Sequence, residues 1–263
     1  MVKWEWNPFD PIPPVEVDAK ISTEKLYLNL KEAFPNFVAD FEQKFTAWQS
    51  RWFDSKTPGL LSSALELCEL PEYDPLIFLG PKIIPLVVYE LTKPGSFIAT
   101  TLYNHLETNR DAKIDPEDVL NSLTLNRHAN LIVELNHERA QRAIAHIKTW
   151  KAHCARVKAL FSQHSNGDLD ADIVCEAYDA LVAMGPGIIG HVMLEYSNDQ
   201  AGSWYKLMYQ LVREKPITEA GEDRRKDFES YWLWRDWFEH REHHEAVEEG
   251  VTPSYLMNAA GMP

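Results

Sequence analysis

Hydrophobic residues recur along this chain every three or four positions, which is the spacing of one face of an α-helix. After Pro35, which interrupts an earlier helix, aromatic residues form such a face: Phe37, Phe41, Phe45, Trp48 and Trp52. The segment from Glu117 to Asn166 contains no glycine or proline and shows the same spacing from Ala140 to Phe161. This pattern predicts one long bundle helix. It disfavours a coiled-coil partner helix, because Trp150 and Cys154 fit a zipper seam poorly.

An eighteen-residue segment occurs twice. Residues 73–90 reappear as residues 178–195, and nine of the eighteen positions are identical. Each copy contains a Gly-Pro pair, Gly80-Pro81 in the first and Gly185-Pro186 in the second. Proline suits the first turn of a helix, because no N–H donor is needed there. The repeat therefore predicts two pairs of helices, each broken at its Gly-Pro corner. The expected repeat units are about 45–105 and 147–212.

The segments around the repeat set the expected domain organisation. Residues 1–21 are rich in proline, aromatic and acidic residues and predict an extended N-terminal arm. Ser22 or Thr23 has the residue type of an N-cap and predicts the start of the first helix there. The expected organisation is a single all-α domain over 22–249, with a tryptophan-rich last helix at 223–249 and a small-residue tail at 250–263.

Composition narrows the function classes. At 263 residues, 45% of them hydrophobic, the chain is long enough to bury a sizeable core. The formal net charge of −14 disfavours nucleic acid and anionic membrane surfaces, which need basic faces. The most apolar stretch, Pro75 to Leu91, is too short and too interrupted to predict membrane insertion. Three cysteines without metal-type spacing indicate free thiols, and we expect a cytoplasmic protein.

Part of the chain resembles a group of small proteins with HEAT-like helical repeats. The residues that carry the resemblance are Trp48, Thr57, Leu61-Ser62-Ser63, Tyr73-Asp74, Leu79-Gly80-Pro81 and Ile84-Pro85, together with a late tryptophan-rich element from Tyr231 to Trp237. The second copy lacks Leu-Ser-Ser and has Gly190-His191 where the first has Pro85-Leu86. The resemblance implies HEAT-like helix hairpins and carries no catalytic residues. With two units, we expect a compact bundle around one central groove.

His191 is the main difference in chemistry between the two copies. It replaces Leu86, an expected core position, and lies four residues before Glu195, so the two share a helical face. Gly187 and Gly190 remove bulk beside it, as the wall of a pocket requires. We expect His191 and Glu195 to face a ligand cavity and to be catalytic, together with Tyr205. A core histidine that serves packing alone remains the alternative.

Further residues are candidates for binding a hydrophobic substrate. Glu90 is the counterpart of Glu195 in the first copy, and a buried carboxyl group can act as an acid or base. Aromatic side chains are expected to form the wall of the cavity. The full set of expected substrate-binding residues is Glu90, Trp204, Tyr209, Trp234 and Trp237. A solvated edge or an ion pair for the glutamate and core packing for the aromatic residues remain the alternatives.

Other motifs have structural interpretations. Asp74 and Asp179 are expected to cap helices, with Tyr73 and Tyr178 packed beside them. His240 and His244 have the i, i+4 spacing of two metal ligands but lack a third, so they indicate a solvated helix end and no metal site. Phosphate-binding, dinucleotide-binding and serine-hydrolase motifs are absent from the sequence.

Two function hypotheses follow. The first is a binding pocket for a hydrophobic small molecule, in a biosynthetic enzyme that needs no cofactor. Its chemistry would be cyclisation or isomerisation, including a pericyclic step such as a Diels–Alder closure, because the walls hold the substrate in a reactive shape and one polar donor polarises it. The second is an adaptor that binds a protein partner through helix grooves, without catalysis.

Overall fold

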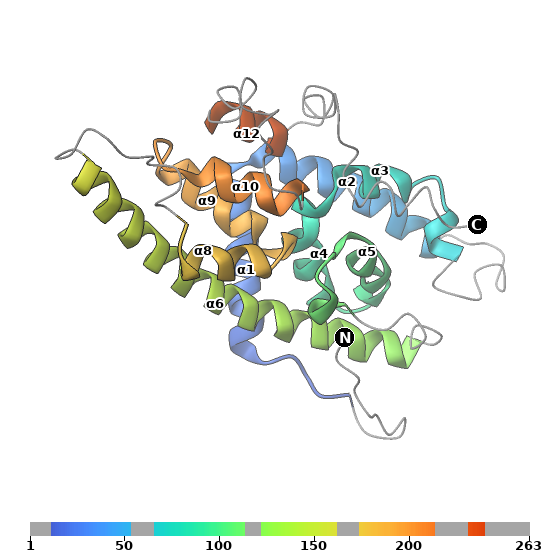
Figure 1. Cartoon of the computed structure of the whole chain (residues 1–263). Coiled ribbons are helices and arrows are strands. Elements are labelled where there is room, and N and C mark those ends of the chain that lie inside the picture. Colours follow the sequence, from blue (N-terminus) through green and yellow to red (C-terminus); the bar gives the residue numbers. More distant parts are fainter. Residues whose placement is uncertain (1–11, 54–65, 114–121, 162–173, 214–230, 240–263) are drawn as a thin grey trace.

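The computed structural model describes residues 12–53, 66–113, 122–161, 174–213 and 231–239, and in these ranges the fold is all-α. The predicted tail, the outer parts of the last helix and most of the arm lie outside the described residues. The helices pack around α1, which contacts α2, α4, α6 and α9 (Figure 1). Their bounds are α1 Val17–Ala33, α2 Pro35–Phe53, α3 Asp74–Leu79, α4 Ile84–Leu91, α5 Ala99–Leu106, α6 Ser122–Phe161, α8 Glu176–Ala183, α9 Ile189–Asn198, α10 Trp204–Arg213 and α12 Tyr231–Glu239.

Helix α1 begins earlier than the sequence suggested. It starts at Val17, so residues 17–21 are helical and the prediction of an extended arm up to residue 21 is wrong there. Ser22 and Thr23 lie inside the helix and do not cap it. The C-terminal end of α1 agrees with the prediction, because α1 ends at Ala33 and α2 begins at Pro35. The proline removes the N–H donor that a continuous helix would need.

The two predicted amphipathic helices are present. In α2 the aromatic face is buried, with Phe37, Phe41, Phe45 and Trp48 each at most 2% exposed. The long helix α6 runs along one side of the molecule (Figure 1). It buries Ala143, Ile147 and Trp150 against the rest of the bundle. Side chains at such positions contribute about 1.5–3 kcal/mol each when fully buried, so these two faces stabilise the fold.

The two copies of the repeat share a backbone conformation. Gly80 and Gly185 both have positive φ, 75° and 72°, where a residue with a Cβ atom would be strained. A short 3₁₀ helix follows each glycine, η2 Pro81–Ile83 and η6 Pro186–Ile188, and leads into α4 or α9. The corners also contact each other reciprocally: η2 meets η6, α4 meets η6, and α9 meets η2. Pro85 and Gly190, which occupy equivalent positions in the copies, lie in direct contact.

A buried cation holds α12 to the first corner. Lys82 is 2% exposed and donates hydrogen bonds to the carbonyl oxygens of Trp237, at 2.6 Å, and Phe238, at 3.0 Å. Its ammonium group also lies 5.1 Å from the centre of the Trp237 ring. A positive charge is favourable at the C-terminal end of a helix, where carbonyl groups lack partners. Within the described residues no single helix has the length and apolarity to cross a membrane, although the pair Glu176–Ala183 and Pro186–Asn198, bent by 103°, meets those criteria jointly.

Candidate functional site

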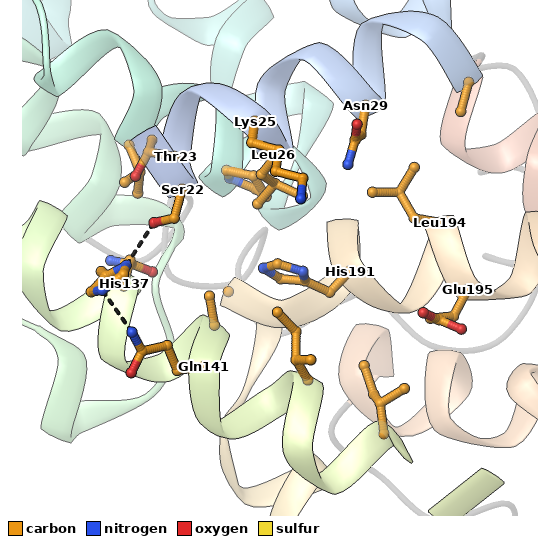
Figure 2. A pocket seen from close by; sticks show the side chains of 18 of the residues that line it. Ser22, Thr23, Lys25, Leu26, Asn29, His137, Gln141, His191, Leu194 and Glu195 are labelled. Carbon is orange, nitrogen blue, oxygen red and sulfur yellow. Dashed lines mark hydrogen bonds between the residues drawn. The ribbon is translucent and has the colours of Figure 1, made fainter. Parts of the chain in front are cut away.

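A cavity of about 790 Å³ lies between α1, α6 and α9 (Figure 2), and residues of α4 also line it. This volume is within the range of small-molecule sites, about 300–1,000 Å³. Aliphatic side chains make up much of the lining: Leu26, Val88, Ala140, Ile144, Ile147 and Leu194. Polar side chains alternate with them along α1, α6 and α9. The site therefore offers an apolar surface together with groups that can orient a ligand.

The second corner of the repeat places His191 in this cavity. The ring belongs to the third residue of α9 and extends from that helix into the space below α1 (Figure 2). Glu195 lies one turn later, on the same face, and also lines the cavity. Leu86, the counterpart of His191 in the first copy, is fully buried in the core. The exchange of leucine for histidine thus gives the second copy alone a polar group at this position.

His191 is neutral at physiological pH. Its ring is partly open to the cavity but surrounded by protein on its other sides, and this burial lowers the pKa of His191 to about 4. The carboxylate of Glu195 opposes that shift without reversing it. No side-chain hydrogen bond joins the ring to another described residue. A neutral imidazole offers one N–H donor and one acceptor nitrogen to a ligand.

A second histidine, His137 of α6, is held in a hydrogen-bond network at the other end of the cavity (Figure 2). Its Nδ1 lies 2.6 Å from Ser22 Oγ, and its Nε2 lies 2.8 Å from the Gln141 side-chain nitrogen. Ser22 Oγ donates to the Ala19 carbonyl oxygen at 3.1 Å. One assignment satisfies all three contacts: Gln141 donates to Nε2, and Nδ1–H donates to Ser22. In this assignment no base accepts the serine proton, so Ser22 is not an activated nucleophile.

The two repeated glutamates both form ion pairs. Glu195 accepts a hydrogen bond of 2.6 Å from Lys151 of α6 at the edge of the cavity. Glu90 accepts one of 2.6 Å from Lys93, and burial raises the pKa of its carboxyl group. Glu90 does not line the cavity, so its predicted role in substrate binding is not supported by its position. The ion pair, given above as the alternative for Glu90, is what the structure contains.

The predicted aromatic wall is not part of this cavity. Among the described lining residues there is no Phe, Tyr or Trp. Trp204 is instead buried edge-on against Trp150, with ring centres 5.0 Å apart, and Tyr205 is buried on the same helix. Trp234 and Trp237 are buried in the core as well, and Tyr209 is half-buried and packs against it. Helical spacing identifies a buried face but does not tell a cavity from another helix, and here the aromatic faces meet helices.

The glycines near His191 leave room for neighbouring side chains, and Gly187 also lines the cavity. A Cβ atom at Gly190 would lie 2.9 Å from Pro85 Cγ, so the glycine allows the two corners to touch. A Cβ atom at Gly187 would lie 1.6 Å from Arg139 Nη1, so the guanidinium group fills the space of the missing side chain. Arg139 in turn pairs with the fully buried Glu107 at 2.7 Å. The second corner therefore encloses a buried charge pair where the first has Lys82.

Sequence reasoning missed the contributions of α1 and α6 to the site. Ser22, Lys25, Leu26 and Asn29 line the cavity from α1, and His137 and Gln141 line it from α6. On α1 these positions follow the spacing i, i+3, i+4 and i+7, which marks one helical face. Because that face is mostly polar, its residues have the pattern of a solvent-facing surface.

The capping and metal predictions have separate outcomes. Neither helix start carries a side-chain capping hydrogen bond, and Asp74 and Asp179 lie within α3 and α8, so their predicted role is wrong. Tyr73 and Tyr178 are buried as expected, and the Tyr73 hydroxyl lies 3.1 Å from His105 Nδ1. His240 and His244 lie outside the described residues. Within the described ranges no group of three or more His, Cys, Asp or Glu side chains is arranged to hold a metal ion.

Comparison of the chain with protein-family models, curated proteins and solved structures finds no match. The HEAT-like resemblance stays a prediction.

Proposed function

We propose that this protein binds a small organic molecule in the cavity between α1, α6 and α9. One observation carries the proposal: a neutral imidazole with no hydrogen-bond partner among the described residues, that of His191, faces a cavity of about 790 Å³ lined by both aliphatic and polar side chains. Ligand sites combine an apolar surface with a few convergent polar groups in this way.

The lining defines the expected ligand. Leu26, Ile144 and Leu194 provide an aliphatic surface for a hydrophobic body. Hydroxyl and amide groups along α1 and α6 provide contacts for polar substituents. The ligand is therefore amphiphilic, and this refines the purely hydrophobic molecule expected from the aromatic content.

For catalysis we propose the chemistry expected from the sequence, a cyclisation or isomerisation without a cofactor. A neutral histidine can donate a hydrogen bond to a carbonyl oxygen and stabilise the charge that develops there. His191 has the position and the protonation state for that role. Tyr205 does not line the cavity, and the Glu195 carboxylate is occupied by Lys151, so His191 carries the catalytic proposal.

The adaptor hypothesis remains the second candidate, and one observation favours it. Val17, Ile21 and Leu28 of α1 are exposed by 71%, 57% and 53%, and they lie on one side of the helix. A row of exposed aliphatic residues is the kind of surface that binds a partner helix. It ranks second because the row consists of only three residues, and exposed aliphatic residues are normal on protein surfaces.

A thermal-shift screen of small organic molecules tests the first proposal. Ala140 lines the cavity, so Ala140→Trp fills it, whereas Ala145 is exposed on the same helix and Ala145→Trp serves as the matched control. We expect stabilising compounds whose effect is lost in Ala140→Trp and kept in Ala145→Trp. Compounds that act equally on both variants, or no active compound, would count against a ligand site in this cavity.

A further inference from the structure

Three hydrogen-bond donors point into the middle of the cavity from two helices. Lys25 and Asn29 lie one turn apart on α1, and His191 faces them from α9 (Figure 2). None of the three side chains forms a hydrogen bond or ion pair with another residue that the structure describes. The Asn29 amide can also turn its oxygen toward the cavity, but an ammonium group donates only. The centre of the site is therefore rich in donors, two of them on the exposed side chains of Lys25 and Asn29.

The charged side chains around Lys25, Asn29 and His191 favour the binding of an anion between these three residues. Lys25 carries an unpaired positive charge among the described residues, while the Glu195 carboxylate is neutralised by Lys151. Glu32 lies seven residues after Lys25 on α1, about 10 Å along the helix axis at 1.5 Å per residue. Glu32 is also only three residues after Asn29, so its carboxylate lowers the local positive potential at that end of the site, whereas salt screens the net charge of the whole chain. His137, the remaining titratable group in the lining, is engaged with Ser22 and Gln141.

We propose that the ligand is a monocarboxylic acid with an aliphatic body, whose carboxylate lies between Lys25, Asn29 and His191; this inference rests on the function proposed above. Charge-assisted hydrogen bonds to a carboxylate are about twice as strong as neutral ones. The body of the acid packs along Leu26, Ile144 and Leu194. The polar head of the ligand then lies at the centre of the cavity, and its aliphatic tail contacts the aliphatic side chains of the lining.

Binding of an acid changes the protonation of the site. The free His191 is neutral, and a carboxylate beside it favours the charged imidazolium form. The pKa of His191 therefore rises in the complex, and the protein takes up protons from solution at pH values above the pKa of about 4 of the free protein. The other charged groups near the ring are Glu195 with its partner Lys151, Lys25 and Glu32 across the cavity, and Arg139 behind Gly187. A neutral ligand causes no such uptake.

Isothermal titration calorimetry with three matched probes tests the proposal: decanoate, decanamide and decylamine. At pH 6.5 we expect decanoate to bind at least tenfold more tightly than the other two. Titration in two buffers that differ in ionisation enthalpy should reveal fractional proton uptake for decanoate, lost in His191→Gln. Lys25→Gln should weaken decanoate binding at least fivefold. Lys20→Gln, an exposed lysine on the same helix that does not line the cavity, should change it less than twofold.

The contrary outcomes are distinct. Equal or tighter binding of decanamide overturns the carboxylic-acid inference, and the proposed ligand site survives if that binding is lost in Ala140→Trp. Decanoate binding without proton uptake, or unaffected by Lys25→Gln, also overturns it. If no probe binds and the screen described above finds no compound, both the inference and the proposed function fail.

Discussion

Substituting Gly187 by alanine tests how the second corner is built. The new Cβ atom would lie 1.6 Å from Arg139 Nη1 and 2.8 Å from Arg139 Cζ, distances that no packed structure contains. The backbone of Gly187 does not have positive φ, so alanine itself causes no conformational strain there. The guanidinium group has to move, and the collision acts on the Glu107–Arg139 pair.

The cost of that movement follows from the burial of the pair. Glu107 is 0% exposed and receives hydrogen bonds from Arg139 at 2.7 Å, from the Asn109 backbone N–H at 2.9 Å and from Tyr103 at 3.3 Å. Breaking a buried ion pair by losing one partner costs about 3–5 kcal/mol. We therefore expect Gly187→Ala to lower the free energy of unfolding by about 3 kcal/mol. In a chain of this size the melting temperature falls by roughly 2–4 °C per kcal/mol.

Urea unfolding at pH 7, followed by tryptophan fluorescence, measures the change. Gly95→Ala is the control: nothing lies within 4 Å of its Cβ position, and its φ of +80° costs an alanine only about 1–2 kcal/mol. In the Arg139→Ala, Glu107→Gln background the added methyl group meets open space, so Gly187→Ala should cost less than about 1 kcal/mol. The reasoning is refuted if Gly187→Ala costs the same in both backgrounds, or less than about 1 kcal/mol in the wild type.

Three further predictions concern other parts of the account. The pKa of His191 is about 6.5 in the unfolded state and about 4 in the folded state, so between these pH values the unfolded state binds an extra proton. The free energy of unfolding therefore falls as the pH drops from about 6.5 to about 4, by at most roughly 3 kcal/mol. The substitution His191→Leu should remove this pH dependence in urea titrations. Lys82→Met leaves the Trp237 and Phe238 carbonyl groups without their donor and should cost about 1–3 kcal/mol, whereas Lys20→Met at an exposed site should cost under about 0.5 kcal/mol in the same assay. Gly190→Ala collides with Pro85 and should cost about 1–3 kcal/mol, and a Pro85→Ala partner substitution should restore part of the loss.

The sequence predicts the elements of this fold well where hydrophobic spacing is regular. The aromatic face of α2 and the long helix α6 follow from periodicity, because an apolar stripe has to be buried in any soluble bundle. The Gly-Pro corners follow from backbone chemistry, since Gly80 and Gly185 adopt positive φ and Pro81 and Pro186 lack a donor. These are local properties, which a chain expresses whatever its tertiary partners are.

The cavity depends on tertiary partners and is harder to predict. The exchange of Leu86 for His191 indicates the right helix, but the opposite wall comes from α1, whose first turn sequence reasoning assigned to an extended arm. Trp204 and Trp237 belong to buried faces, and periodicity does not say whether a buried face meets a ligand or a helix. The space at Gly187 is filled by Arg139, nearly fifty residues away in sequence, and no local pattern indicates that contact.

A crystal structure of the chain with the tightest compound from the thermal-shift screen tests the central claim most directly. The account predicts density for the compound between α1, α6 and α9, with a polar atom within hydrogen-bond distance of the His191 ring. Density bound instead to another surface, with the cavity filled by side chains or solvent alone, would contradict it.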